Sequence, residues 1–226
     1  MPDAPSLIYR SAAGYELVMR ALYGRHYRAR LRAVADQVPS GSSVLELCPG
    51  PGALYRRHLR GRVSAYTGVE VNAGFADHLR RLGATVVQRD LTAPGPLPEA
   101  DVAIIQASLY HFLPAADTIV QQMLTAARQR VIIAEPIRNL SSSRLGWLAA
   151  LGRHGTDPGA GDGHEQRFDE GSLDRLMAAY GDVTTAAFTI PGGREKVFVL
   201  DPGQGPAPDP GRVPAPTGRP GKAAGP

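Results

Sequence analysis

The sequence predicts an α/β fold: a doubly wound, mostly parallel seven-stranded sheet with helices on both faces, in three α/β/α layers. Three observations predict it. Apolar segments alternate with segments of helical spacing over residues 43–181, and parallel strands need such crossover helices. The segment "DVAIIQAS" (101–108) is almost continuously apolar, as in strands buried on both faces. Finally, "VTTAAFTI" and "EKVFVL" flank the turn "PGGR", which predicts a hairpin with an antiparallel last strand.

The remaining elements follow from the same periodicities. Apolar residues recur at helical spacing between Tyr15 and Val38, and Gly24 marks a potential break. The other expected strands are 43–47, 65–71, 84–90 and 130–136, and the other expected helices are 53–60, 73–83, 115–128 and 170–181.

We expect three parts in the chain. Residues 1–40 form a helical N-terminal cap, and residues 41–201 form the sheet domain. Residues 202–226 form a Pro- and Gly-rich tail, which we expect to be disordered because it has few large apolar side chains to offset the entropy of ordering. A chain of 226 residues is long enough for one such domain with a full core.

Charge and cysteine content restrict the function classes. The formal charge is +4, and the densest basic group is Arg25–Arg32. We expect this group to be a solvated helix face, with binding of an anionic partner such as lipid headgroups or RNA as the alternative. The single cysteine, Cys48, excludes an intramolecular disulfide and a multi-cysteine zinc site. Without a membrane-length apolar run or a signal-peptide pattern, we expect a cytoplasmic protein.

The stretch "VLELCPGPG" (44–52) leaves the first expected strand through a turn with few side-chain atoms. Ligands of open α/β sheets bind beyond the carboxyl ends of the strands, which is where this turn lies. Gly50 and Gly52 lack the Cβ atoms that would keep a ligand from the backbone, and the prolines stiffen the turn. The amides of both glycines and of Ala53 remain available to a polar ligand.

An acidic residue strengthens this interpretation. Glu70 ends the second expected strand, where a carboxylate can accept hydrogen bonds from both hydroxyls of a ribose. Asp90 follows the third strand, either as a ligand contact or as a cap or surface acid. A dinucleotide fingerprint begun at Gly50 would need a small residue where Tyr55 stands, which disfavours NAD. The predicted ligand is an adenosine-bearing compound other than a dinucleotide.

At this point the sequence resembles a known family. Four segments are similar, in order and spacing, to the motifs of class I S-adenosylmethionine-dependent methyltransferases: "VLELCPGPG" (44–52), "YTGVEVN" (66–72), "QRDL" (88–91) and "ADVAIIQASLYHFL" (100–113). The resemblance covers about residues 40–135 and implies a Rossmann-like fold with S-adenosyl-L-methionine as the cofactor. One position departs from the pattern, since the family usually has glycine where Cys48 stands. We expect this thiol to be a packed small residue rather than a nucleophile.

The resemblance also implies a role for individual residues around the methionine part of the cofactor. Glu46, Cys48 and the turn of Gly50 and Gly52 would surround that part. Gln106, at the end of the fourth strand, would lie near its amino and carboxylate groups.

The nucleoside part would be bound by the next two strand ends. Glu70 would hold the ribose hydroxyls, and its neighbour Val71 belongs to the same expected site. Asp90 and the amide of Leu91 would recognise the edge of the adenine.

Methyl transfer requires the protein to position a nucleophile, to exclude water and, for a hydroxyl or protonated amine, to supply a base. His111 and Tyr110 follow the fourth strand, where the family often has a Leu-His-His-Leu-like stretch. His111 is either the base or a structural hydrogen-bonding residue, and Tyr110 lines the substrate pocket or packs in the core. His154 and His164 are alternative bases or exposed loop residues.

Residues 137–168 form an unusually long connection after the fifth strand, which we expect to be a lid over the pocket. Within it, Trp147 either contacts substrate or packs in the core. Arg138 and Glu135 are weaker candidates at the same rim. No tight spacing of histidines and carboxylates requires a metal, and we expect none.

The leading hypothesis is therefore methyl transfer from S-adenosylmethionine to a small-molecule acceptor. The alternatives are a nucleic-acid methyltransferase or binder that uses the basic N-terminal helix, an NAD(P)-dependent oxidoreductase, and a non-catalytic S-adenosylmethionine-binding protein. The Asn/Asp-Pro-Pro-aromatic signature of nucleic-acid amino methylation is absent after the fourth strand, where "QASLY" (106–110) stands.

Overall fold

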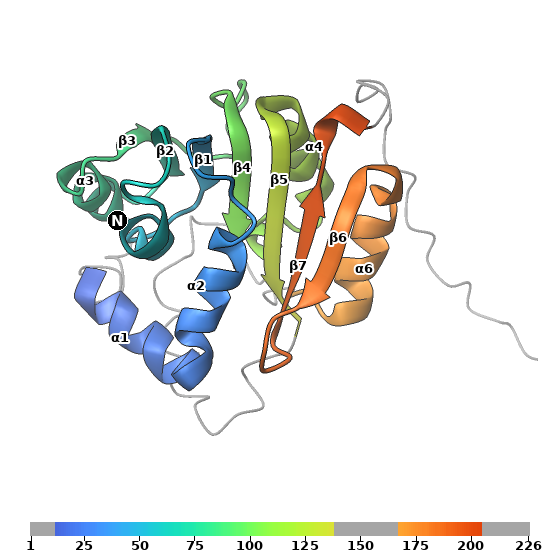
Figure 1. Ribbon diagram of the computed structural model, residues 1–226, viewed down its shortest axis with the longest axis horizontal. Helices are drawn as coiled ribbons and strands as arrows, with labels where there is room; N and C mark the ends of the chain where they lie inside the picture. The colour runs from blue at the N-terminus through green and yellow to red at the C-terminus, as the bar shows by residue number, and fades with distance from the viewer. Residues whose placement is uncertain (1–11, 138–166, 205–226) are drawn as a thin grey trace, which may run out of the picture.

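The computed structural model describes residues 12–137 and 167–204, and Figure 1 shows their arrangement around a central sheet. The sheet has seven strands in the order β3-β2-β1-β4-β5-β7-β6. The strands are β1 (Ser43–Leu47), β2 (Ala65–Glu70), β3 (Thr85–Gln88), β4 (Ala100–Gln106), β5 (Ala127–Pro136), β6 (Thr184–Thr189) and β7 (Glu195–Leu200). Strands β1 to β5 are parallel, whereas β7 is antiparallel to both β5 and β6. The predicted sheet and its terminal hairpin are confirmed.

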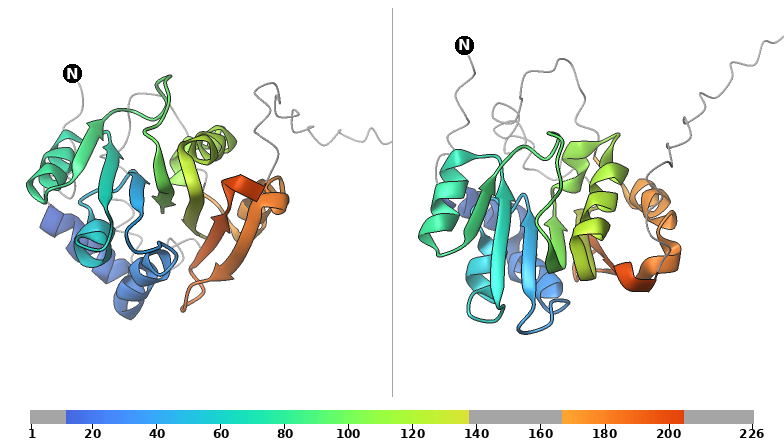
Figure 2. Two further views of the ribbon diagram at one scale, coloured as in Figure 1. Left: turned by 45° about the horizontal axis from the view of Figure 1, so that its top comes forward. Right: turned by 90° about the horizontal axis from the view of Figure 1, so that it is seen from above.

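Helices cover both faces of this sheet. The bounds are α1 (Ala12–Tyr23), α2 (Tyr27–Ala35), α3 (Ala73–Arg81), α4 (Ala116–Ala126) and α6 (Glu170–Ala178). Figure 1 shows α2 in front of the lower ends of the central strands, with α4 and α6 behind the sheet, and Figure 2 shows the twisted sheet from two further directions.

Each face has its own apolar core, because side chains alternate between the faces along every strand. One core joins α1, α2 and α3 to the strands through residues such as Leu31, Leu79 and Val102. The other joins α4 and α6 to the strands through residues such as Met123 and Leu173. β4 carries buried side chains into both cores, which explains the continuous apolar run of its sequence.

The segment after the glycine turn differs from its prediction. A continuous α-helix was expected over 53–60, but Tyr55–Leu59 form a π-helix. The Arg60 amide donates to the Tyr55 carbonyl, five positions back. Tyr55 is buried with its ring stacked on that of Tyr66, and Leu59 is fully buried. The wider turn places these two core residues against the sheet, a tertiary effect that helical periodicity does not reveal.

The N-terminal helical region breaks at Gly24, as predicted. Gly24 has a φ of 51° and begins a short 3₁₀ turn (Gly24–His26) between α1 and α2. The interpretation of the basic cluster as a solvated face is wrong for one residue. Arg25, Arg28 and Arg32 are exposed, but Arg30 is buried.

Several predicted features lie outside the described residues. These are the tail beyond residue 204, most of the lid segment, and the candidate residues Arg138, Trp147, His154 and His164, whereas Pro202–Gln204 form a 3₁₀ turn. Within residues 12–137 and 167–204, no helix has the length and apolar character needed to cross a membrane.

Candidate functional site

The carboxyl end of β1 lies at the topological switch point of the sheet. β1 pairs with β2 on one side and with β4 on the other, so the chain leaves the centre of the sheet in two opposite directions. The connections that follow these strands diverge, and this position is the usual ligand site of open α/β sheets. The glycine turn begins here, directly after Leu47.

The two glycines of the turn serve different purposes. Gly50 and Gly52 have φ values of 56° and 70°, a region that favours glycine. A Cβ atom at Gly52 would lie 2.4 Å from Cδ2 of Leu79 in α3, so this glycine allows close packing of the protein itself. A Cβ atom at Gly50 would meet no atom within 4 Å. Gly50 therefore faces open space, where a ligand can approach the backbone.

Cys48 shows why the resembled motif has glycine at its first position. Its φ of 52° is a conformation that side chains with a Cβ atom rarely adopt. The Cys48 amide donates to the Val69 carbonyl at 2.9 Å, and its side chain packs beside the core that contains α4 and α6. Burial raises the pKa of the Cys48 thiol, which disfavours the reactive thiolate.

Glu70 connects the turn to the end of β2. One carboxylate oxygen accepts from the Gly50 amide at 2.9 Å, and the other accepts from the Asn72 amide at 2.8 Å. Burial raises the pKa of Glu70, and these amide contacts oppose that rise. Each carboxylate oxygen retains a second lone pair, so the fixed carboxylate can still accept two hydroxyl groups.

The residues predicted around the nucleoside follow this carboxylate in the sequence, at the ends of β2 and β3. Val71 is 62% exposed, an unusual amount for a large apolar side chain that follows a buried strand. Asp90 is exposed, and its carboxylate accepts from the Thr92 amide at 2.8 Å within its own turn. Leu91 is buried in the core. The structure thus offers an apolar surface at Val71 and a polar turn at Asp90.

Glu46 is a buried acid in the middle of the sheet. Its carboxyl group accepts a hydrogen bond of 2.6 Å from the Tyr66 hydroxyl on β2. Burial raises the pKa of Glu46 to about 7, although the bond from Tyr66 opposes that rise. This acid therefore titrates near neutral pH.

A second buried acid supports the segment after β4. Glu135 is fully buried, and its Oε1 accepts from the amides of Ser108 and Leu109 at 2.8 and 2.7 Å. Its Oε2 has no hydrogen-bond partner within the described part of the chain. Burial raises the pKa of Glu135 to about 8, although the hydrogen bonds from the amides oppose that rise. Glu135 fixes the start of a 3₁₀ turn, Leu109–Phe112, that carries the catalytic candidates Tyr110 and His111.

Those candidates form an aromatic pair. The rings of Tyr110 and His111 have centroids 4.0 Å apart, and the guanidinium carbon of Arg167 lies 4.5 Å from the centre of the Tyr110 ring. His111 is exposed, whereas Tyr110 is partly buried against the core. A pocket beside them is lined by Leu113, Pro114, Ala116, Arg167, Phe168, Asp169, Ser172 and Leu176.

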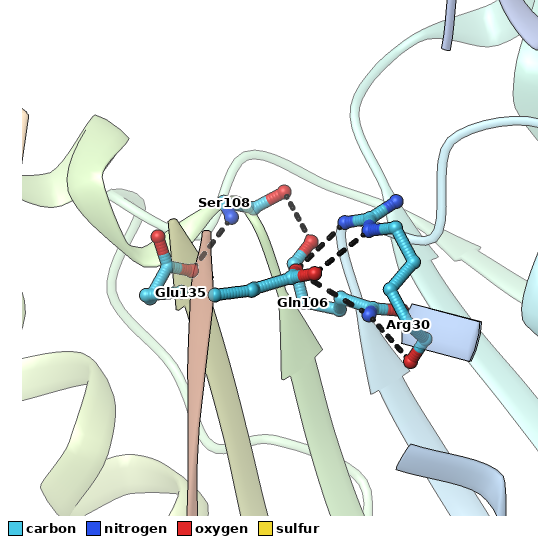
Figure 3. Close-up of polar contacts among 5 residues, drawn as sticks. Arg30, Gln106, Ser108 and Glu135 are labelled. Atoms are coloured by element: carbon cyan, nitrogen blue, oxygen red, sulfur yellow. Dashed lines mark hydrogen bonds and ion pairs between the residues drawn. The ribbon is translucent and has the colours of Figure 1, made fainter. Parts of the chain in front are cut away.

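The amide of Gln106 lies in a polar cluster that joins three elements (Figure 3). Nε2 of Gln106 is 3.3 Å from the carbonyl oxygen of Arg30 in α2 and 3.5 Å from Oε1 of Glu195 in β7. The Arg30 guanidinium donates twice to the Glu195 carboxylate, through Nε and Nη2, both at 2.9 Å. The Tyr23 ring lies 4.3 Å from the guanidinium carbon. Sequence reasoning missed Arg30 and Glu195 as site residues, because no local pattern relates positions 165 residues apart.

No group of three or more His, Cys, Asp or Glu residues suited to hold a metal ion occurs within residues 12–137 and 167–204. The polar groups described above are suited to hydrogen bonding of an organic ligand.

Comparisons with known proteins identify the fold. No family model matches the sequence, and no curated protein matches it. Among solved structures, magnesium protoporphyrin IX methyltransferase (ChlM) of Synechocystis with bound S-adenosylhomocysteine is 15% identical, with a TM-score of 0.58 over 85% of this chain and 95% of that one. A chain of the complex between the Haloferax volcanii Trm112 methyltransferase activator and a methyltransferase is 11% identical, with a TM-score of 0.63 over 91% of this chain and 100% of that one. The mitomycin 7-O-methyltransferase MmcR is 17% identical, with a TM-score of 0.55 over 86% of this chain and 59% of that one.

At these identities the similarity defines the fold. The chain has the Rossmann-like fold of S-adenosylmethionine-dependent methyltransferases, as the sequence resemblance implied. The glycine turn, Glu70 and Gln106 all lie at the carboxyl edge of this fold, where the sequence analysis placed them.

Proposed function

We propose that this protein transfers a methyl group from S-adenosyl-L-methionine to a small-molecule acceptor. The observation that carries the proposal is the Glu70 carboxylate, which is fixed by two backbone amides beside the open side of Gly50 at the switch point. The fold supports the proposal, since its solved neighbours include methyltransferases with bound S-adenosylmethionine or S-adenosylhomocysteine.

The residues at this edge fit such a cofactor. Glu70 would accept hydrogen bonds from the ribose hydroxyls, and the exposed side chain of Val71 would pack on the adenine ring. Asp90 and the amide of Leu91 would bind the edge of the adenine. Gly50 leaves room for the chain of the methionine part. When bound, the cofactor supplies a methyl group that its sulfonium charge has already activated.

The chain itself would position the acceptor and receive its proton. His111 is our proposed base, because it is exposed at the rim on a turn whose backbone Glu135 fixes. Tyr110, held between His111 and Arg167, would line the acceptor site. His154 as an alternative base, and Trp147 and Arg138 as acceptor contacts, belong to the lid proposed over residues 137–168.

A small-molecule acceptor is favoured over nucleic acid. Two solved neighbours are named for small-molecule substrates, a porphyrin and mitomycin. The nucleic-acid hypothesis relied on the basic cluster, and the burial of Arg30 in an ion pair removes one cation from that surface. Its test must therefore neutralise Arg25, Arg28 and Arg32 but retain Arg30, and measure salt-dependent RNA affinity.

The packing of Tyr55 disfavours a dinucleotide. Its ring is stacked on Tyr66 with centroids 4.1 Å apart and fills the interface between the π-helix and β2. The dinucleotide fingerprint requires a small residue at this position for close helix–strand packing. Calorimetric titration should therefore detect binding of S-adenosylhomocysteine but no binding of NAD.

The proposed reaction is tested with cofactor labelled in its methyl group. A metabolite extract is incubated with the protein and labelled cofactor, and mass spectrometry searches for compounds that gain one methyl group. We expect a labelled product with the wild type, and a lower turnover at retained cofactor affinity for His111→Ala. Cofactor binding without any labelled product would favour the non-catalytic binding protein, and full turnover in His111→Ala would exclude that residue as the base.

A further inference from the structure

The orientation of the Gln106 side chain can be deduced from its neighbours. Its Nε2 lies 3.3 Å from the carbonyl oxygen of Arg30 and 3.5 Å from the nearer carboxylate oxygen of Glu195. A carbonyl oxygen only accepts hydrogen bonds, and so does the carboxylate of an ion pair. Both neighbours therefore require the NH₂ group of the amide on this side.

Reversal of the amide would place its oxygen beside two other oxygens, one of them charged. Although the two contacts are long for hydrogen bonds, this repulsion selects the orientation. The Gln106 carbonyl oxygen, Oε1, must then point away from Arg30 and Glu195. Within residues 12–137 and 167–204, no donor is within hydrogen-bond reach of Oε1.

The groups that impose this orientation are themselves firmly held. Arg30 and Glu195 are buried and form two parallel hydrogen bonds of 2.9 Å, the strongest geometry for such a pair. The aromatic ring of Tyr23 lies against the guanidinium group and restricts it further. Helix α2, through Arg30, and strand β7, through Glu195, therefore both contact Gln106, and Figure 3 shows its contact with Arg30.

We propose that the Arg30–Glu195 ion pair positions Gln106 so that Oε1 accepts a hydrogen bond from the α-ammonium group of the cofactor. The inference rests on the proposed function and deepens it. The family resemblance implies that Gln106 lies near both the amino and the carboxylate group of the cofactor, and a carbonyl oxygen can bind the first but repels the second. Gln106 is the contact, and Arg30 and Glu195 are positioning residues.

The test compares two ligands, S-adenosylhomocysteine and its deamino analogue, in which hydrogen replaces the α-amino group. Glu195→Gln removes the charge of one of the two acceptors that orient Gln106 but keeps the shape of the side chain. We expect this variant to bind S-adenosylhomocysteine about tenfold more weakly, with the affinity for the deamino analogue within about twofold of wild type. A loss from general misfolding would weaken both ligands alike.

Asp174→Asn is the matched control. Asp174 forms an ion pair with Lys196, the next residue along β7, at 2.7 Å, and so joins this strand to α6. Its substitution removes a carboxylate charge beside the same strand without acting on Gln106. We expect neither ligand to change in affinity by more than about twofold.

A double-mutant cycle distinguishes positioning from direct contact. Gln106→Leu should show the same ligand-selective loss, and adding Glu195→Gln to it should cause no further loss. If Glu195→Gln still weakens S-adenosylhomocysteine selectively in the Gln106→Leu background, Glu195 binds the ammonium itself and the inference is wrong. The inference is also overturned if Glu195→Gln loses affinity equally for both ligands, or loses affinity for neither.

If the proposed function itself is wrong, the experiment gives a different result. In that case the wild-type protein binds neither S-adenosylhomocysteine nor its deamino analogue, and the inference about Gln106 has no basis. A wild type that binds S-adenosylhomocysteine more tightly than the analogue retains the proposed function, whatever the variants show.

Discussion

The two ends of the candidate site differ in how they are built. At the β1–β2 end, the Glu70 carboxylate and the Gly50 amide are 20 positions apart in the sequence, and backbone groups hold the acid. At the β4–β7 end, a buried ion pair joins Arg30 to Glu195 across 165 positions. The first end depends on one strand–helix–strand unit, from β1 to β2, whereas the second requires α2, the centre of the sheet and the last hairpin to assemble. Local sequence can therefore specify the first end alone.

The largest expected effect comes from breaking the ion pair at the β4–β7 end. Arg30→Met leaves the Glu195 carboxylate buried without its partner, and we expect the free energy of unfolding to fall by about 3–5 kcal/mol. The exposed Arg28 on the same helix provides the control, and Arg28→Met should change stability by less than about 0.5 kcal/mol. Urea unfolding of both variants measures the difference. Similar stabilities for the two would show that the ion pair does not join the cap to the sheet.

The next effect concerns a buried acid of the local end. Because burial raises the pKa of Glu46 to about 7, the folded state binds more protons than the unfolded state between the ordinary carboxyl pKa and that value. Stability from this group is present at low pH and is lost as pH rises through 7. From pH 5 to pH 8 the free energy of unfolding should fall by roughly 2–3 kcal/mol more in the wild type than in Glu46→Gln. Glu99→Gln, at an exposed site, should leave the wild-type dependence unchanged.

The third prediction concerns cofactor affinity at the β1–β2 end. We expect this effect to be comparable in free energy with that of Glu46, or smaller. Glu70→Ala removes the carboxylate proposed to bind the ribose, and we expect S-adenosylhomocysteine to bind about 1–3 kcal/mol more weakly in calorimetry. Asp77→Ala removes an exposed acid of α3 and should not alter the affinity. An unchanged affinity in Glu70→Ala would reject the ribose role.

The smallest effect concerns the backbone of the turn. Cys48→Gly and Cys48→Ala both remove the thiol, but only alanine retains a Cβ atom at a φ of 52°. The glycine variant should be more stable than the alanine variant by about 1 kcal/mol, the reverse of the order expected in a helix or strand. Thermal unfolding compares the two, and a more stable alanine variant would contradict the left-handed conformation.

Much of the fold could be predicted from the sequence, because each strand carries its own pattern. The apolar run in β4 and the hairpin turn before β7 are local signals, and both elements form as predicted. Glu70 could be placed for the same reason, since the carboxyl end of a strand is readable from one segment.

The features that the sequence did not predict depend on contacts between distant residues. The π-helix at Tyr55–Leu59 arises where side chains meet the sheet, and helical spacing alone gives no sign of it. Arg30 has the sequence context of a solvated arginine, because its partner Glu195 lies on another element. Charge composition could not separate this buried arginine from its exposed neighbours.

The central claim is that a sulfonium nucleoside binds at the glycine turn with its ribose held by Glu70. A crystal structure of the protein with S-adenosylhomocysteine tests it most directly. We predict both ribose hydroxyls within hydrogen-bond distance of the Glu70 carboxylate and the nucleoside against the open side of Gly50. An empty crevice at saturating ligand, or a ligand bound away from β1 and β2, would contradict the account.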